Sequence, residues 1–168
     1  MGAGNFEIEI SGRLAGGLTL AEIRKNAAAM LKAVGWQKAS LSLLLTSDRE
    51  IRKINKKHLG HDYATDVITF GQLDEETGGP APGGKPFLGD IVISLDTARR
   101  QAGQYGNTFK YEFYFYLCHG ILHIAGFEDG SAAERGRMHR IQESILREIG
   151  IAGGGPQSAA VKIRRHRK

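Results

Sequence analysis

The chain has 168 residues, of which 41% are hydrophobic and 24% are charged. These proportions are typical of a globular domain with its own core and exclude a low-complexity or disordered chain. The net charge is +5, and residues 161–168 hold five cations and no acid, while residues 1–160 carry 18 basic and 18 acidic side chains. The excess charge therefore belongs to a terminal arm, which predicts either contact with phosphate backbones or a disordered, solubilising tail.

Three further features concern the cellular compartment. The longest apolar runs are much shorter than a membrane span. Residues 1–5 lack the basic and apolar regions of a signal peptide. Cys118 is the single cysteine, so an intramolecular disulfide is excluded, which suits a reducing cytoplasm. We therefore expect a cytoplasmic protein with no membrane partner.

The first half of the chain predicts strands alternating with helices. Residues 6–10 alternate apolar and polar side chains, as in a half-buried strand, and residues 40–46 predict a second strand. Apolar residues at helical spacing predict a helix over 19–34, and the spacing of Ser47 and Glu50 is that of a capping box that starts another. The second helix has a basic outer face that is either solvated or in contact with RNA. Its cations are Arg49, Arg52, Lys53, Lys56 and Lys57.

The second half predicts a strand pair followed by three helices. Strands over 67–70 and 87–94 flank a flexible loop rich in glycine and proline. A helix is expected over 95–105, and the next begins at Phe109 and is apolar on nearly every face, so it should be buried at the centre. A capping box at Ser131 starts the last helix, which ends before Gly150.

These elements predict an α+β fold in which a small mixed four-stranded sheet packs around the buried central helix. We expect one metal-dependent domain over residues 1–150. A flexible Gly-rich linker and the basic tail should occupy residues 151–168.

A candidate metal site lies in the stretch His-Gly-Ile-Leu-His-Ile-Ala-Gly-Phe-Glu-Asp over residues 119–129. On a helix, His119 and His123 share one face, one turn apart. Gly126 favours a helix end and a chain reversal, after which Asp129 can turn back toward the two rings. Two imidazoles and one carboxylate with an open fourth position are a catalytic zinc arrangement, although another divalent metal that accepts imidazole would fit the spacing. We therefore predict one Zn²⁺ per chain, bound by His119, His123 and Asp129.

Metzincin proteases have the same spacing of two histidines, a glycine and a third ligand. They also need a glutamate directly after the first histidine as general base. Gly120 occupies that position here, so a peptidase would lack its proton shuttle.

The run His-Gly-x-Leu-His-x-x-Gly-aromatic resembles the signature of the YbeY family, the bacterial endoribonucleases and rRNA maturation factors. A second stretch is similar to the family pattern Asp-x-Pro-Thr-Asp-Val-aliphatic-Ser-Phe, and a third is Leu-Gly-Asp-Ile over 88–91. The resemblance covers about residues 5–150. The matching residues of the second stretch are Asn55, Asp62, Thr65, Asp66, Val67, Ile68, Thr69 and Phe70.

The chain departs from the family pattern at three positions. Asp129 stands where the third ligand is usually histidine, and its negative charge should make a bound water less acidic. Ala64 replaces a proline. Leu59 falls where the family usually has an arginine thought important for activity, because a cation near the metal can clamp a phosphate. Nearby His58 and His61 either take that role or are surface histidines in a turn.

The third matching stretch contains Asp90, which is a candidate to hold a ligand ring by a hydrogen bond. It is equally a candidate to cap or pair at the start of its strand.

The resemblance implies a zinc-dependent, single-strand endoribonuclease that acts in rRNA maturation, including the 16S 3′ end, and in ribosome quality control. Its partners would be rRNA and the small ribosomal subunit. The metal would activate a water or stabilise charge on a phosphate oxygen, and the sequence identifies no general acid or base. Two alternatives stay open. One is a non-catalytic ribosome-assembly factor with a structural zinc, which Leu59 favours. The other is a metal-dependent peptidase-like hydrolase, which Gly120 disfavours.

Overall fold

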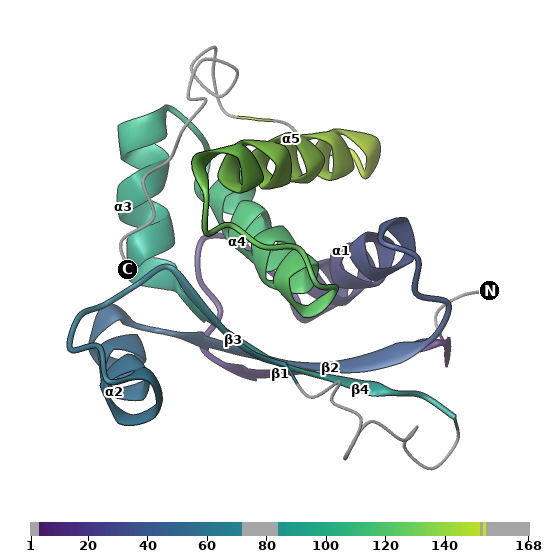
Figure 1. The fold of residues 1–168 in the computed structure, drawn as a ribbon, viewed down its shortest axis with the longest axis horizontal. Helices are drawn as coiled ribbons and strands as arrows, with labels where there is room; N and C mark the ends of the chain where they lie inside the picture. Colours follow the sequence, from purple (N-terminus) through teal and green to yellow (C-terminus); the bar gives the residue numbers. More distant parts are fainter. Residues whose placement is uncertain (1–3, 72–83, 152, 154–168) are drawn as a thin grey trace.

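The computed structural model describes residues 4–71, 84–151 and 153 (Figure 1). Within these residues the chain forms four strands and five helices, close to the predicted bounds. The elements are β1 (Phe6–Gly12), α1 (Leu20–Ala33), β2 (Ala39–Thr46), α2 (Asp48–Leu59), β3 (Val67–Gly71), β4 (Phe87–Ser94), α3 (Leu95–Tyr105), α4 (Phe109–Ile124) and α5 (Ala132–Glu148).

The strands form one mixed sheet in the order β1-β2-β4-β3. β1 and β4 each pair with β2 in parallel, and β3 pairs with β4 antiparallel. Figure 1 shows α1, α4 and α5 on one side of this sheet and α2 on the other. The predicted α+β fold with a mixed four-stranded sheet is therefore confirmed.

The central helix is α4, and it is buried on all sides. Every residue from Tyr111 to Leu122 is buried, as expected for a segment without a polar face. Contacts with β3, β4, α1, α3 and α5 surround it. Each large apolar side chain that is fully buried here contributes about 1.5–3 kcal/mol relative to exposure, so α4 is fixed firmly in place. Its C-terminal end can therefore hold functional side chains rigidly.

The other face of the sheet carries α2, which is amphipathic. Ile51 of α2 packs with Ile68 and Val92 in a smaller second core. The helix starts at Ser47, whose hydroxyl accepts a hydrogen bond from the N–H of Glu50. The Glu50 carboxylate turns outward to Lys53, so only half of the first predicted capping box is realised. The basic side chains predicted for the outer face are all exposed.

The second predicted capping box, at Ser131, has both of its hydrogen bonds. The loop predicted over 71–86 and the linker and tail predicted over 151–168 lie largely outside the described residues. In the part of the chain that the structure does describe, no helix is long and apolar enough to cross a membrane.

Candidate metal centre

The C-terminal end of α4 turns the chain back on itself. The N–H of Phe127 donates to the carbonyl of Leu122 at 3.0 Å, and the N–H of Gly126 donates to that of His123 at 3.0 Å. This pair of bonds is the Schellman motif, which needs a left-handed residue just beyond the helix. Gly126 supplies it with a φ of 102°. The reversal returns Asp129 to the helix face that carries His123.

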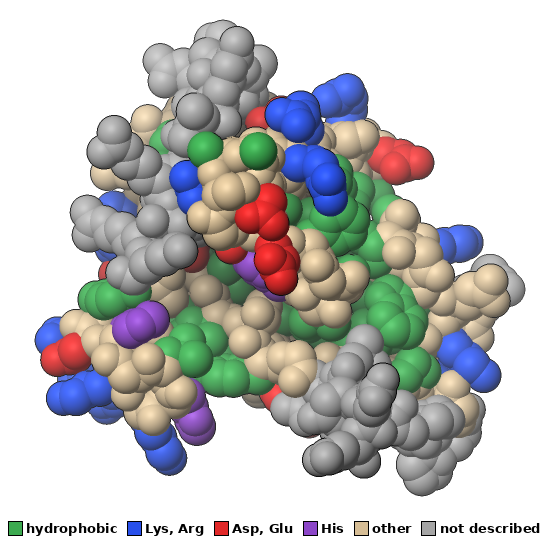
Figure 2. Space-filling model, viewed as in Figure 1, with side chains coloured by type: hydrophobic (Ala, Val, Ile, Leu, Met, Phe, Trp, Pro, Cys, Tyr) green, Lys and Arg blue, Asp and Glu red, His purple; other side chains and the backbone are tan. Residues whose placement is uncertain are grey.

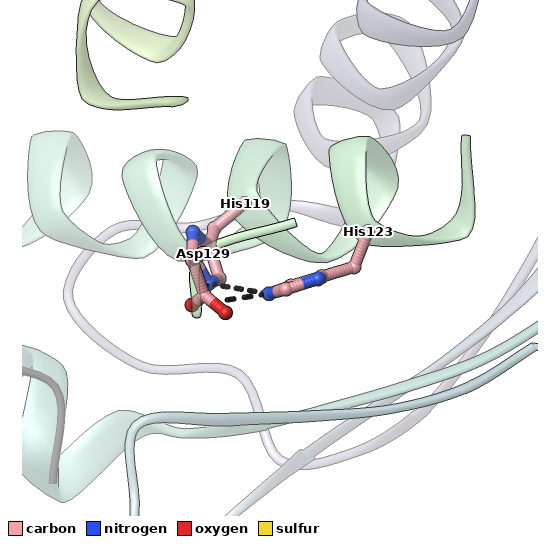
Figure 3. A group of neighbouring side chains, drawn as sticks. All are labelled: His119, His123 and Asp129. Carbon is pink, nitrogen blue, oxygen red and sulfur yellow. Dashed lines mark hydrogen bonds and ion pairs between the residues drawn. The ribbon is translucent and has the colours of Figure 1, made fainter. Parts of the chain in front are cut away.

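The structure brings the three predicted ligands together (Figure 3). His119 Nε2 and His123 Nε2 lie 3.0 Å apart, and each lies 3.3 Å from Asp129 Oδ2. Tetrahedral zinc with bonds of about 2.0–2.2 Å requires ligand atoms roughly 3.3–3.6 Å apart. Both nitrogen–oxygen separations meet this requirement, and the nitrogen–nitrogen separation is only slightly shorter. The donor set therefore fits one face of a zinc tetrahedron.

The protonation state of His123 also suits a metal ligand. Burial lowers the pKa of His123, and the neighbouring His119 lowers it further, while the Asp129 carboxylate partly offsets both effects. His123 is therefore neutral at pH 7, which is the form that binds a metal.

Gln142 of α5 orients His119, and sequence reasoning did not find it. Gln142 is fully buried; its Oε1 lies 3.3 Å from His119 Nδ1, and its Nε2 donates to the carbonyl of Phe115 at 2.9 Å. Because the amide group is held by Phe115, its oxygen faces the ring and accepts the Nδ1 proton. His119 Nε2 is then left with its lone pair toward His123 and Asp129. The available signal was a polar residue on the inner face of α5, one turn beyond Met138.

The ligands lie at one wall of an open cavity of about 440 Å³. Its other walls come from the end of α2, the following loop and edge strand β3. Figure 2 shows acidic side chains near the centre of this face, with a histidine partly covered behind them, and basic side chains at its lower left, where Figure 1 has α2. Besides the three ligands, the lining residues are Asn55, Leu59, His61, Tyr63, Thr65, Asp66, Val67, Ile68 and Thr69.

The other residues singled out from the sequence have different positions. Leu59 lines the cavity and is 48% exposed, and His61 also lines it. His58 is exposed, and its ring packs edge-to-face with that of Phe70, with the ring centroids 5.4 Å apart. The interpretation of Asp90 as the partner of a ligand ring is not supported. Asp90 pairs across the ladder with Phe70, whose side chain packs in the core under α2, so both side chains share the sheet face opposite α4.

Gly120 lies on the face of α4 that packs against β3 and β4. A Cβ at this position would lie 3.0 Å from two side-chain atoms of Ile91 and 3.1 Å from Thr69 Cγ2. Any larger side chain would have to push these two side chains aside. The tight packing therefore disfavours a glutamate at the position where metzincins carry their general base.

The fold and the site define an α+β protein with a His-His-carboxylate centre of the kind that can bind a divalent metal. The family model "Endoribonuclease YbeY" matches residues 17–150, and the chain belongs to this family. The resemblance of the three sequence motifs is thereby confirmed.

Two curated relatives and one solved structure show the extent of the similarity. The chain is 43% identical over 143 residues to endoribonuclease YbeY of Anaeromyxobacter sp. strain Fw109-5, which covers 82% of this chain and 71% of the relative. It is 39% identical over 136 residues to that of Moorella thermoacetica, covering 79% and 86%. The solution structure of TM1509 from Thermotoga maritima has a TM-score of 0.57 and 26% identity, and the match covers 84% of this chain and 91% of that one.

Proposed function

We propose that this chain is a zinc-dependent endoribonuclease that cleaves single-stranded RNA. The observation that carries the proposal is the triangle formed by His119 Nε2, His123 Nε2 and Asp129 Oδ2 at the wall of an open cavity. A structural zinc would be enclosed by four protein ligands, whereas this triangle leaves a coordination position facing the cavity. Membership of a family of endoribonucleases supports RNA as the substrate.

Each residue of the site has a defined task in this proposal. When bound, zinc lowers the pKa of a water and polarises a phosphate oxygen. Gln142 holds the His119 ring so that Nε2 faces the ligand triangle. His123 is kept neutral by burial, and Asp129 adds the only negative charge among the three ligands. That charge makes a bound water less acidic than three imidazoles would.

We further propose that the substrate is rRNA, that the chain acts in maturation that includes the 16S 3′ end and in ribosome quality control, and that the small ribosomal subunit is its partner. A cytoplasmic location accompanies this role. The support comes from the family and from the exposed cations of α2, which lie beside the cavity and suit a phosphate backbone. The five cations of residues 161–168 lie outside the described residues, and their contact with RNA stays a prediction.

The test begins with elemental analysis of protein purified without chelator, where about one zinc per chain is expected. The purified protein is then incubated with a single-stranded RNA that contains a 16S rRNA 3′ end. Cleavage should stop when a chelator is added and return with zinc. The variant His123→Ala should be inactive while its circular dichroism spectrum matches that of the unchanged protein. Cleavage by His123→Ala at the unchanged rate would overturn the proposal.

The second candidate is a non-catalytic ribosome-assembly factor with a structural zinc. One observation favours it, because Leu59 exposes an apolar side chain in the cavity where family members usually carry arginine. This candidate predicts zinc binding and binding to the small ribosomal subunit without any RNA cleavage. The chelator experiment separates the two, since only the enzyme loses a cleavage activity that zinc restores.

A further inference from the structure

We propose that the cavity beside the metal centre binds an unpaired nucleobase, which stacks on the aromatic pair His61 and Tyr63. The inference rests on the proposed function, because it identifies the part of an RNA strand that this cavity holds. Both residues line the same cavity as the three candidate ligands. Their planes are 10° from parallel, and their centroids are 5.4 Å apart.

The aromatic pair is part of a loop fixed to α2. The N–H of His61 donates to the carbonyl of Asn55 at 3.3 Å, and the Asn55 side chain donates to the carbonyl of Tyr63 at 3.0 Å. Asn55 is 2% exposed, so its amide has little freedom to move. Asp62, which lies between the two aromatic residues in the sequence, accepts a hydrogen bond from Arg52 Nε at 2.8 Å. A platform that is already ordered costs little entropy when a ligand binds.

The two rings also contact each other directly. Tyr63 Oη lies 3.3 Å from His61 Nδ1, which is within hydrogen-bond distance. Tyr63 is half-buried, His61 is exposed and both residues line the cavity, so the pair is accessible to a base that enters it.

The chemistry of the cavity suits a base better than a phosphate. Leu59, Val67 and Ile68 supply apolar surface to its walls. Of the described residues that line it, none is a lysine or an arginine, so this wall offers a phosphate no permanently cationic side chain. Apolar surface and π faces are what a base requires, since every base can stack whatever its sequence. The volume of about 440 Å³ is in the range of small-ligand sites.

Charges for the phosphate backbone lie just outside the cavity. The exposed face of α2, which leads into the platform loop, carries arginine and lysine. Asp62 pairs with Arg52 at 2.8 Å and with Lys56 at 3.8 Å, and Glu50 pairs with Lys53 at 3.2 Å. Among the described residues, Arg49 and Lys57 of this face have no ion-pair partner. A polyanionic strand is drawn to this surface, whereas an apolar peptide gains nothing from it. The arrangement therefore favours a nucleic-acid strand with one base in the cavity and its phosphates outside.

Binding of two fluorescent strands tests the proposal with the protein as purified. One is a 2′-O-methyl uridine hexamer, whose sugars resist cleavage, and the other is the same backbone without bases. Both carry the same charge, so contacts to phosphates or metal cancel in the comparison. The unchanged protein should bind the uridine strand more tightly. Tyr63→Ala should lose about 5- to 100-fold of that affinity, as expected for one base–aromatic stack, and lose little for the abasic strand.

Three further variants serve as controls. Tyr63→Phe keeps the ring and should bind almost as the unchanged protein does. Phe87→Ala removes a ring that is 37% exposed at the start of β4, away from the cavity lining, and should leave the preference intact. His61→Ala, at an exposed position, should lose part of the preference for the uridine strand over the abasic strand. This variant tests the inference if Tyr63→Ala does not fold.

Equal affinity of the unchanged protein for the two strands would overturn the inference. If Tyr63→Ala lost the same affinity for both strands, the inference would also fail. It would fail too if the unchanged protein bound an apolar peptide more tightly than the uridine strand. These readouts measure binding alone. If the protein cleaves RNA but shows no preference for the strand with bases, the base-binding inference fails and the proposed function stands. If it shows that preference but does not cleave RNA, the inference stands and the proposed function fails.

Discussion

Gln142 is the residue that decides which nitrogen of His119 faces the other ligands. Its amide lies in the core with both ends occupied, one by the ring and the other by a carbonyl of α4. Partners of this kind fix the tautomer and the angle of a metal-binding imidazole, and their loss typically costs 10- to 100-fold in metal affinity.

We therefore expect Gln142→Leu to bind zinc about 10- to 100-fold more weakly than the unchanged protein, because His119 loses the acceptor for its Nδ1 proton. Competition with a chromophoric chelator measures the affinity, at a temperature where both proteins are folded. Gln37→Leu makes the same change at an exposed position and serves as the control. Equal zinc affinity in Gln142→Leu would show that the glutamine has only a packing role.

Glycine-to-alanine substitutions at two helical positions, Gly120 and Gly103, should change the stability in opposite directions. Gly120→Ala should destabilise the fold by about 1–3 kcal/mol, because the new methyl group is forced against the fully buried Ile91. Gly103→Ala, at an exposed position of α3 with open space around the new methyl group, should stabilise it by about 0.5–1 kcal/mol. Urea denaturation measures both. Stabilisation by Gly120→Ala would mean that the sheet can move away from α4.

At this scale the sequence predicts what depends on local spacing. The interval between His119 and His123, together with Gly126, predicted that these side chains and Asp129 lie close together, since helix geometry and a single turn bring them there. Gln142 was out of reach because its contact with His119 joins two helices whose packing no local pattern specifies. The two interpretations of Asp90 stayed open for a similar reason, because pairing with β3 shows which face of the sheet it occupies.

At the level of elements, Asp48 connects the starts of α2 and α3. Its carboxylate accepts hydrogen bonds from the hydroxyls of Ser94 and Thr97 and from Arg100, each at 2.6 Å. Burial opposes ionisation of this carboxyl, but these hydrogen bonds and the charge of Arg100 outweigh it, so its pKa lies below the usual value of 3.8. Ionised Asp48 therefore stabilises the folded state.

Asp48→Asn should lower the free energy of unfolding by about 1–3 kcal/mol at pH 7, as is typical when a hydrogen-bonded charge is removed. Because the pKa is lower in the folded state, this stabilisation is complete above the unfolded pKa and is lost as pH falls through the folded pKa, below 3.8. The difference in free energy of unfolding between the unchanged protein and Asp48→Asn should therefore become smaller as the pH falls. Urea denaturation between pH 7 and pH 3 measures it, with the exposed Glu9→Gln as control. A difference independent of pH would contradict this account.

The bounds of most elements were predictable, and their arrangement was not. Caps at Ser131 and glycines after helices are local signals, and both strands of the β3–β4 pair were found from their sequence. The position of β2 between β1 and β4 depends on pairings between residues far apart in the sequence, as between Ile8 and Leu41 and between Leu43 and Ile91. Such non-local pairing has no sequence period, so the sheet order could come only from the structure.

For the molecule as a whole, the candidate metal centre joins parts of the chain that pack separately. Two ligands come from the rigid end of α4, and Asp129 comes from the segment that leads into α5. Arg135 of α5 donates to the carbonyl of Asp129 at 3.3 Å, so this segment is also connected to the last helix. A metal at the triangle therefore binds the folded chain far better than the unfolded one, in which the ligands are dispersed.

Zinc should accordingly raise the midpoint of thermal unfolding. At a free concentration 100 times the dissociation constant, a ligand specific to the folded state adds about 2.7 kcal/mol. For a domain of this size that corresponds to about 5–10 °C, measurable by differential scanning calorimetry with and without zinc. Asp129→Ala should lose most of this shift, because the triangle is left with two imidazoles. Glu128→Ala removes an exposed carboxylate one residue earlier and should keep it. An equal shift in both variants would mean that zinc binds elsewhere, while loss in Asp129→Ala alone would identify the aspartate as the third ligand.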